Sequence, residues 1–387
     1  MESSINTEFD DIRPFRDEEL PAVIARLLDN PQFRAVLGYV FKGGNMQELE
    51  SKIRSFKTIR DFQHEFVKRK VFSIAKQTSD GIEWGGVAKP SADEAYTYIS
   101  NHRDIVLDAS LLNALLVDLG CETTEIAIGD NLLLFDWIED LVRLNRSFIV
   151  RRGVSIRQML EVSNHLSRYI HYVVENQKHS VWIAQREGRA KNSDDRTQES
   201  LLKMLAMGGK AKDFTTNLQS LNILPLAFSY EYDPCDYLKA RELQMRRDNP
   251  DFKKAEGEDL LNMQTGIFGK KGRIFVQFGK PINSELAKID HSLPKGEQAK
   301  QAAEIIDREI FLNYHFYPGN YIAYDRLWGN GRCSGEYTNA DVKVFDDYIN
   351  RQLGKIVLEN RDEEFLRLRI LEMYGYPVKN QLFAKGL

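Results

Sequence analysis

The feature of this sequence that most constrains its fold is a regular alternation of short β-prone runs with longer helical patterns. It extends from Gly81 to about residue 280, and the β-prone runs lie at 96–100, 125–129, 147–151, 180–186, 222–230 and 273–279. Strands separated by helices need crossover connections, and such connections give a largely parallel sheet covered on both faces. The sequence therefore predicts an α/β fold with a mostly parallel sheet flanked by helices.

Helical patterns also occupy both ends of the chain. From Asp17 to about Lys76 the apolar residues recur near the 3.6-residue period, and Pro21 suits the first turn of a helix. After Pro294 the pattern is again helical. We expect an N-terminal helical segment (1–80), an α/β domain (81–290) and a C-terminal helical extension (291–387). Pro225 inside the fifth β-prone run predicts an edge strand or a bulge there.

Composition excludes several classes of protein. The net charge of −4 argues against a nucleic-acid partner, because duplex binding usually needs a basic surface. The three cysteines lie far apart without metal-ligand spacing, which favours a reduced, intracellular setting. The acidic N-terminus "MESSINTEFDDIRPF" does not read as a secretory signal, and no window approaches the roughly eighteen apolar residues of a spanning helix. We expect a cytoplasmic protein that can lie on a membrane without crossing it.

A histidine follows the first β-prone run. Asn101 and His102 leave the carboxyl end of the expected strand 96–100, which is where open α/β sheets bind ligands. Asp108 precedes a leucine-rich helical pattern that ends at Gly120. A carboxylate that holds the far nitrogen of a histidine makes it a general base. Alternatively, Asp108 is a helix N-cap and His102 an ordinary loop histidine.

His102-Arg103-Asp104 also resembles the start of a kinase catalytic loop. That template requires an asparagine where this chain has Ala109, and the chain shows neither a glycine-rich loop on an early strand nor an Asp-Phe-Gly motif. We therefore reject a kinase.

Charged residues follow two further β-prone runs. Arginines 143, 146, 151, 152 and 157 occur with no acid between them, which indicates a local anion site, a membrane-facing patch or a solvated helix end. Glu187-Gly188-Arg189 comes just after the run 180–186 and is expected at the edge of the sheet.

In order, these blocks resemble the glycerolipid acyltransferase family, most of all its glycerol-3-phosphate and dihydroxyacetone-phosphate acyltransferases. The family's H-x4-D block is similar to Asn101-His102 with Asp108, and its second block is similar to "SFIVRR" with Arg151 and Arg152. Its E-G-x-R block is similar to Glu187, Gly188 and Arg189, and its proline-containing fourth block to "ILPLAFSYEY". The resemblance covers roughly residues 81–282.

Two departures leave alternatives open. The spacing from His102 to Asp108 is H-x5-D, one residue longer than in the family, so either Asp108 or Asp104 is the acid beside the histidine. In the third block, either Arg189 or Lys191 is the anion ligand.

The resemblance implies transfer of a fatty acyl group from acyl-CoA or acyl carrier protein to a hydroxyl of glycerol-3-phosphate or a lysophospholipid, in phospholipid biosynthesis. His102 would be the base, partnered by Asp108, and Arg151, Arg152, Glu187, Gly188 and Arg189 would bind the acceptor and its phosphate. Neither a cofactor nor a metal is expected. We expect peripheral binding to the inner face of the membrane, through the arginines of 143–157 and an amphipathic N-terminal helix. The alternatives are an O-acyltransferase of an amino-acid-headed lyso-lipid and a catalytically inactive lipid-binding relative.

Overall fold

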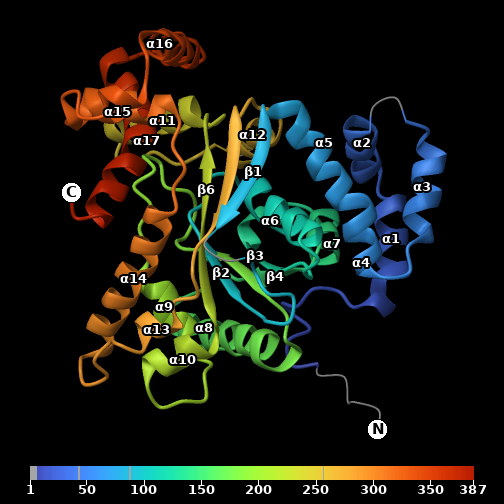
Figure 1. Ribbon diagram of the computed structural model, residues 1–387. Coiled ribbons are helices and arrows are strands. Elements are labelled where there is room, and N and C mark those ends of the chain that lie inside the picture. The colour runs from blue at the N-terminus through green and yellow to red at the C-terminus, as the bar shows by residue number, and fades with distance from the viewer. Residues whose placement is uncertain (1–6, 42–43, 87–88, 256) are drawn as a thin grey trace.

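A seven-stranded sheet forms the centre of the protein (Figure 1). The structure is a computed structural model that describes residues 7–41, 44–86, 89–255 and 257–387. The strands lie in the order β1-β7-β6-β2-β5-β3-β4, and all neighbours are parallel except β6 and β7. They are β1 (Gly81–Gly86), β2 (Thr97–Ser100), β3 (Glu125–Gly129), β4 (Ser147–Val150), β5 (Val181–Ala184), β6 (Ile223–Tyr230) and β7 (Arg273–Phe278). The predicted α/β fold with a mostly parallel sheet is confirmed.

All six β-prone runs of the sequence form strands, and β1 is an additional one. Glycines occupy three of the six positions in β1, and glycine is depleted in strands, so its local pattern gave no strand signal. The strand instead depends on its neighbour, because it pairs along its whole length with β7, from Gly81 opposite Arg273 to Gly86 opposite Phe278.

The prediction that Pro225 marks an edge strand or a bulge is wrong, since β6 lies between β2 and β7. The pairing of β6 with β7 ends at Leu226 opposite Phe278, and the Pro225 carbonyl accepts a hydrogen bond from the Gly279 amide at 2.9 Å. The missing N–H of Pro225 would point to the same side as this carbonyl, beyond the end of β7. Proline therefore forfeits only the reciprocal bond of this last pair, at the end of the β6–β7 ladder.

Helices cover both faces of the sheet with separate apolar cores. One face packs against α8 (Ile156–His171), which continues as a π-helix (Tyr172–Gln177), and against α9 (Glu199–Leu205), α10 (Phe214–Ser220), α13 (Asn283–Leu286) and α14 (Lys295–Leu312). The other face packs against α5 (Lys68–Thr78) and α6 (Leu107–Asp118). After α6, Gly120 adopts a positive φ of 79°, the left-handed conformation expected just past a helix end.

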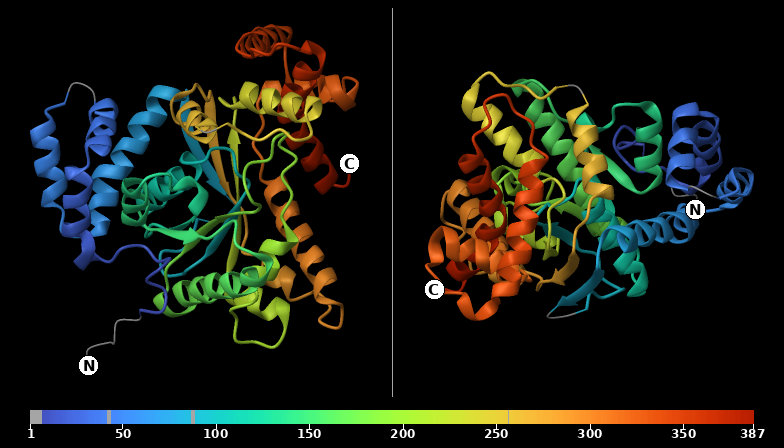
Figure 2. Two further views of the ribbon diagram at one scale, coloured as in Figure 1. Left: turned by 180° about the vertical axis from the view of Figure 1, so that it is seen from behind. Right: turned by 90° about the horizontal axis from the view of Figure 1, so that it is seen from above.

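The N-terminal helices form a third core at one side of the sheet (Figure 2). They are α1 (Leu20–Asp29), α2 (Pro31–Val40), α3 (Met46–Ser55) and α4 (Ile59–Asp61), which continues through a π-helix (Phe62–Val67) into α5. Pro21 lies in the first turn of α1, as predicted. This core reaches the sheet through α7 (Asp136–Leu144), whose Leu144 is fully buried in it.

The C-terminal helices lie on the opposite side (Figure 2). Here α11 (Asp236–Asp248) packs with α15 (Pro318–Tyr324), α16 (Asn339–Gly354) and α17 (Glu363–Ala384) around a fourth core. The remaining helical elements are α12 (Glu258–Phe268), a π-helix (Asp325–Gly329) and short 3-10 helices at Asp17–Glu19, Asp130–Leu132 and Ser334–Glu336. The helical additions at both ends are confirmed, whereas the domain boundaries at residues 80 and 290 stay predictions.

A buried carboxyl group at the start of β3 makes the stability of the fold depend on pH. Glu125 is 8% exposed, and its Oε2 accepts a hydrogen bond from the Tyr169 hydroxyl at 2.5 Å. Burial raises the pKa of Glu125 from 4.5 to about 7. The folded protein therefore holds a proton that the unfolded chain has released between these pH values, and stability falls as pH rises through this interval.

We expect Glu125→Gln to remove this dependence, because the neutral amide keeps an oxygen for Tyr169 and carries no charge to bury. Above pH 7 the variant should be more stable than the parent by up to about 3 kcal/mol, and the two should converge below about pH 4.5. Urea unfolding at several pH values measures the difference. Glu122→Gln, at a half-exposed position nearby, is the control. A parent whose stability rises between pH 5 and 7, with an unchanged slope in Glu125→Gln, would contradict the assignment.

Candidate active site

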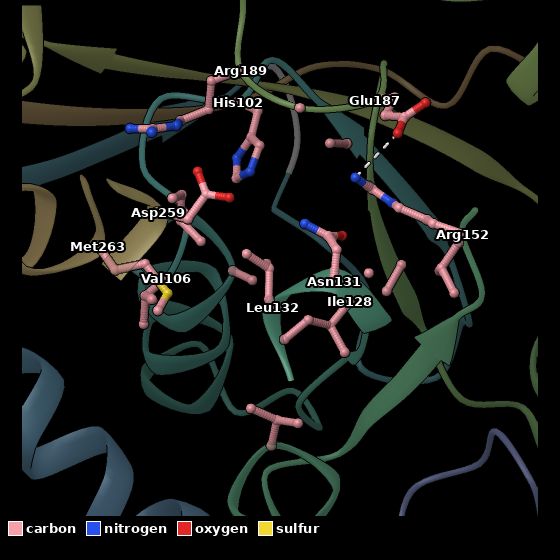
Figure 3. Close-up of a pocket in the computed structure, with 18 of the residues that line it drawn as sticks. His102, Val106, Ile128, Asn131, Leu132, Arg152, Glu187, Arg189, Asp259 and Met263 are labelled. Atoms are coloured by element: carbon pink, nitrogen blue, oxygen red, sulfur yellow. Dashed lines mark ion pairs between the residues drawn. The ribbon is translucent and has the colours of Figure 1, made fainter. Parts of the chain in front are cut away.

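Five strand ends meet at one edge of the sheet. Strands β2, β3, β4, β5 and β6 run in the same direction, so their carboxyl ends lie together. His102 follows β2, Asn131 follows β3, Arg152 follows β4, Glu187 and Arg189 follow β5, and Tyr230 ends β6. Figure 3 shows His102, Asn131, Arg152, Glu187 and Arg189 around a common space. The predicted site residues are thus brought to one place.

Asn101 fixes the backbone from which His102 projects. Its side chain is fully buried and forms two hydrogen bonds with the backbone of Phe228 on the neighbouring strand β6. Nδ2 donates to the Phe228 carbonyl at 2.9 Å, and Oδ1 accepts from the Phe228 amide at 2.8 Å. The Trp182 ring lies edge-on to the His102 ring, with centroids 5.6 Å apart. The histidine is therefore held by packing and by backbone geometry.

His102 is paired with Asp108. Its Nδ1 lies 2.9 Å from Asp108 Oδ2, and the same oxygen accepts the backbone amides of Arg103 at 2.6 Å and Asp104 at 3.0 Å. An ionised carboxylate only accepts, so Nδ1 carries the proton and Nε2 keeps its lone pair. The His102 side chain is 13% exposed, whereas Asp108 is fully buried. This tautomer is the one required to take a proton from a substrate.

Asp104 has a different role from Asp108. Its Oδ1 accepts the amides of Val106 at 2.9 Å and Leu107 at 2.8 Å, which forms a tight turn just before α6. Burial is the main cause that raises the pKa of Asp104, and repulsion from Asp108 is the second. Of the two aspartates that the sequence leaves open, Asp108 contacts the ring. The turn at Asp104 shows how a spacing one residue longer still returns Asp108 to His102.

The interpretation of Asp108 as a helix N-cap is wrong. Helix α6 begins at Leu107, its N-cap position is Val106, and Asp108 lies inside the first turn. The Asp108 carboxylate points back to the loop that carries His102.

Tyr230 is a site residue to which the sequence analysis assigned no role. Its hydroxyl donates to Asp108 Oδ1 at 2.9 Å, so both oxygens of the buried carboxylate are hydrogen-bonded. Burial and the nearby Asp108 raise the pKa of Tyr230 well above its ordinary value, so it stays a donor. The signal available in the sequence was the position of Tyr230 at the end of a β-prone run, because parallel strands end at one edge of the sheet.

We expect Tyr230→Phe to lower kcat by about 10- to 100-fold, the worth of a hydrogen bond to a buried charge. The acid limb of the pH–rate profile should also move to higher pH, because a carboxylate that has lost a donor holds the imidazolium proton more strongly. Initial rates between pH 5 and 9 measure both effects. Tyr232→Phe is the control, since Tyr232 stacks on Tyr348 away from the site. A fall in rate without a shift of the limb would make Tyr230 only structural.

Arg152 and Glu187 form one wall of the site. Arg152 Nη1 lies 3.2 Å from Glu187 Oε1, and the Arg152 amide donates to Asp130 Oδ1 at 3.1 Å. A Cβ on Gly129 would lie 2.5 Å from Asn131 Oδ1 and 2.7 Å from Arg152 Nε, so a larger residue there would displace these two side chains. Gly188 has a φ of 65°, which also favours glycine. Arg151 lines the same space but turns toward Asp11, 3.6 Å away.

Arg189 and Lys191 lie on another wall. Arg189 Nη2 donates to Asn262 Oδ1 at 3.2 Å, and Nη1 is buried without a hydrogen-bond partner among the residues described. Lys191 Nζ donates to Glu242 Oε2 at 2.5 Å. Lys191 thus has a carboxylate partner, whereas Arg189 Nη1 has no hydrogen-bond partner among the residues described.

The arginines of 143–157 do not form one uninterrupted basic patch. Four of the five pair with acids from outside the run: Arg143 with Glu139 at 3.1 Å, Arg146 with Glu122 at 3.6 Å, Arg151 with Asp11 at 3.6 Å, and Arg152 with Glu187 at 3.2 Å. Arg143 also donates to the backbone carbonyls of Asp10 and Arg13. Apart from Glu139, the acids that pair with these arginines come from distant parts of the chain, so the local sequence gave no sign of them.

These walls enclose a cavity of about 1790 Å³, larger than the roughly 300–1,000 Å³ of ordinary ligand pockets. In Figure 3 the side chains of Val106, Leu132 and Met263 lie below His102, with the Asp259 carboxylate beside them and the Arg152–Glu187 pair farther away. Helices α2, α7, α8 and α12 supply further apolar lining, including Val36, Leu141, Val162, Ile267 and Phe268. The cavity therefore joins a charged end at His102 to an extended apolar region.

Several exposed apolar side chains also surround this cavity. They come from five parts of the chain and are Val36, Tyr39, Val106, Leu134, Phe135, Met159, Leu260 and Phe268. Within the ranges described, no helix is long and apolar enough to cross a membrane. Over the same ranges, no group of three or more His, Cys, Asp and Glu side chains is arranged to hold a metal ion.

No family model matches the chain, and no curated protein sequence matches it. Among solved structures, the crystal structure of the 1-acyl-sn-glycerophosphate (LPA) acyltransferase PlsC from Thermotoga maritima is similar at 12% sequence identity, with a TM-score of 0.33. The match covers 75% of this chain and 93% of that chain. A TM-score this low supports no conclusion about activity, which must come from the site itself.

Proposed function

We propose that the protein is an O-acyltransferase that moves a fatty acyl group from a thioester to a hydroxyl. The observation that carries this proposal is the His102–Asp108 pair at the charged end of a long apolar cavity. A base with a free Nε2 suits deprotonation of an alcohol, and the apolar region suits a fatty acyl chain. The cationic side chains beside the base suit a phosphate on the acceptor.

The reaction follows from this geometry. Nε2 of His102 takes the hydroxyl proton as the alcohol oxygen attacks the thioester carbonyl carbon, and Asp108 stabilises the imidazolium that forms. The tetrahedral intermediate collapses with cleavage of the C–S bond, and the imidazolium returns its proton to the departing sulfur. No acyl-enzyme is required. Base catalysis contributes about 10²–10⁴-fold, so positioning of both substrates supplies much of the remaining rate.

The acceptor that we favour is glycerol-3-phosphate or a lysophospholipid, with acyl-CoA or acyl carrier protein as donor, in membrane lipid synthesis. Arg189, with its unpaired Nη1, is the candidate phosphate ligand nearest this chemistry, and Arg151, Arg152, Glu187 and Gly188 shape the opposite wall. The carboxylate of Asp259 also faces the cavity (Figure 3). It gives a specific reason to keep an amino-acid-headed lyso-lipid, whose ammonium it would attract, as a second candidate.

A panel of acceptors tests the proposal. Purified protein is incubated with acyl-CoA or acyl carrier protein and with glycerol-3-phosphate, lysophosphatidate or an amino-acid-headed lyso-lipid, and acylated products are measured. Transfer to a phosphate-bearing acceptor is the expected result. Transfer only to the amino-acid-headed lyso-lipid would support the second candidate. Binding of lipids without transfer to any acceptor would support a catalytically inactive relative.

We also propose that the protein works at the inner face of the membrane, with the exposed apolar residues around the cavity in contact with lipid. Leu134→Asp combined with Met159→Asp should reduce binding to anionic vesicles, because both side chains line the cavity and are more than half exposed. Vesicle sedimentation measures the bound fraction. Val357→Asp, at an exposed site outside the cavity lining, is the control.

The same assay tests the contribution of charge. Binding of the parent should weaken between 0.1 M and 1 M salt, since the Debye length falls from about 10 Å to about 3 Å. Equal binding by the parent and the double variant would exclude this surface as the contact.

A further inference from the structure

The cavity beside His102 carries far more positive than negative charge, although the whole chain has a net charge of −4. Eight of its lining side chains are basic and three are acidic: Arg151, Arg152, Arg186, Arg189, Lys191, Arg246, Lys254 and Arg369, against Glu187, Glu242 and Asp259. Such a surplus attracts anions, and low-dielectric walls strengthen the attraction. A single acceptor phosphate does not need this many cations.

Part of this charge forms a separate cluster on α11 and its surroundings. We call it the α11 cluster: Lys191 from the loop after β5, Glu242 and Arg246 from α11, Lys254 from the following loop, and Asp259 from α12. In Figure 3, Arg189 and Asp259 lie on one side of His102 and the Arg152–Glu187 pair lies on the other. The cavity therefore has charged groups on two sides of the base.

Within the cluster, one buried carboxylate faces three cations. Glu242 is 6% exposed; Lys191 Nζ and Arg246 Nε lie 2.5 Å and 3.0 Å from its two oxygens, and Lys254 Nζ lies 3.9 Å away. Lys254 also contacts Asp259 at 2.7 Å. Burial lowers the pKa of Lys191 against the attraction of Glu242, and repulsion from Lys254 adds to the lowering. A further anion at this place would relieve the repulsion.

The depth of the cations differs between the two positions. Arg189, close to His102, has a buried and unpaired Nη1. Arg246 is more exposed, with 52% of its side chain accessible, and Lys254 keeps 30%. The phosphate of glycerol phosphate is only three carbons from the reacting hydroxyl, so it must bind close to the base. The phosphate of a pantetheine thioester is separated from the carbonyl by the whole pantetheine arm, so it must bind farther out.

We propose that the α11 cluster is the subsite for the phosphate that the acyl donor carries on its pantetheine arm. This phosphate chemistry is common to coenzyme A and acyl carrier protein. The inference rests on the proposed function, because it assigns the second anion to the second substrate of acyl transfer. Arg246 and Lys254 are the ligands; Glu242 holds Arg246 in place, and Asp259 holds Lys254.

Titration calorimetry with coenzyme A, 4′-phosphopantetheine and pantetheine tests the subsite without turnover. The test variant combines Arg246→Gln with Lys254→Gln, and the control combines Arg247→Gln with Lys253→Gln. The control residues are sequence neighbours that remove the same charge but do not line the cavity. The test variant should bind both phosphorylated probes about tenfold or more weakly, as expected for charged hydrogen bonds, and pantetheine unchanged. The control should bind all three probes like the parent.

The arms of the experiment separate the sources of the phosphate. Equal losses for coenzyme A and 4′-phosphopantetheine would support the phosphate on the pantetheine arm. A loss for coenzyme A alone would overturn the inference, because the cluster would then bind the nucleotide phosphates. Lys254→Gln alone repeats the test if the double variant is unstable on thermal melting. Unchanged binding of all probes, a loss of glycerol-3-phosphate affinity instead, or a parent that binds no phosphorylated probe would overturn the inference. A parent that binds coenzyme A through the cluster but transfers no acyl group would overturn only the proposed function.

Discussion

His102→Ala should lower the rate of acyl transfer by about 10²–10⁴-fold, the usual contribution of a general base, while the protein stays folded. The fold should survive because Asp108 keeps three hydrogen bonds without the imidazole, from the amides of Arg103 and Asp104 and from the Tyr230 hydroxyl. Initial rates with the acceptor identified by the panel, together with thermal melting, measure both properties.

Two comparisons make this test specific to the base. His165→Ala removes a histidine of α8 that pairs with Asp11 and does not line the cavity, so its rate should be unchanged. Added imidazole should restore part of the activity of His102→Ala, because a small base can occupy the space that the side chain has left. A His102→Ala protein that is fully active and equally stable would end the acyltransferase proposal as stated here.

Asp108→Asn should cost about 10⁴-fold in kcat, the loss seen when the acid of a serine-protease triad becomes an amide. The substitution fits the space, because its oxygen can accept the three donors around Oδ2 while its NH₂ donates to the Tyr230 hydroxyl. An amide does not stabilise the imidazolium, and a flipped amide would favour the wrong tautomer of the ring. Rates and melting temperatures of the variant measure the loss of activity and the retention of the fold.

Asp104→Asn is the matched comparison. Its amide oxygen can still accept the Val106 and Leu107 amides, so the turn before α6 should persist and kcat should fall less than about tenfold. If Asp104→Asn lost as much activity as Asp108→Asn at unchanged stability, Asp104 would be the partner of the base in the working enzyme. The acyltransferase proposal would survive that outcome.

Six of the seven strands could be predicted from the sequence because each of the six is a short apolar run bounded by turn residues, as in "EIAIG" of β3. Their order could not. The antiparallel pairing of β6 with β7 and the existence of glycine-rich β1 both depend on partners distant in sequence. Pro225 was misread because its tolerance depends on where β7 ends, which no local pattern reports.

The candidate site also has a part that the sequence predicted and a part that it did not. The carboxyl ends of parallel strands meet at one edge of a sheet. This rule was enough to predict a shared edge for His102, Arg152, Glu187 and Arg189. Whether Asp104 or Asp108 meets the ring depended on a turn of a few residues, which spacing alone left open. Tyr230 and the α11 cluster required docking of β6 and α11, so the sequence showed no sign of their contacts.

The hydrogen bonds between Asn101 and Phe228 also have a consequence for how the protein folds. These two residues are 127 positions apart in the sequence, and the hydrogen-bonded Tyr230 and Asp108 are 122 positions apart. Contacts of such sequence separation form slowly, because the entropy of closing the intervening chain is lost before the contact compensates. A nascent chain released before β6 emerges has His102 and Asp108 but lacks the strand that orients them. Acquisition of activity during refolding should therefore follow the slow formation of the central sheet and lag behind the appearance of helical signal.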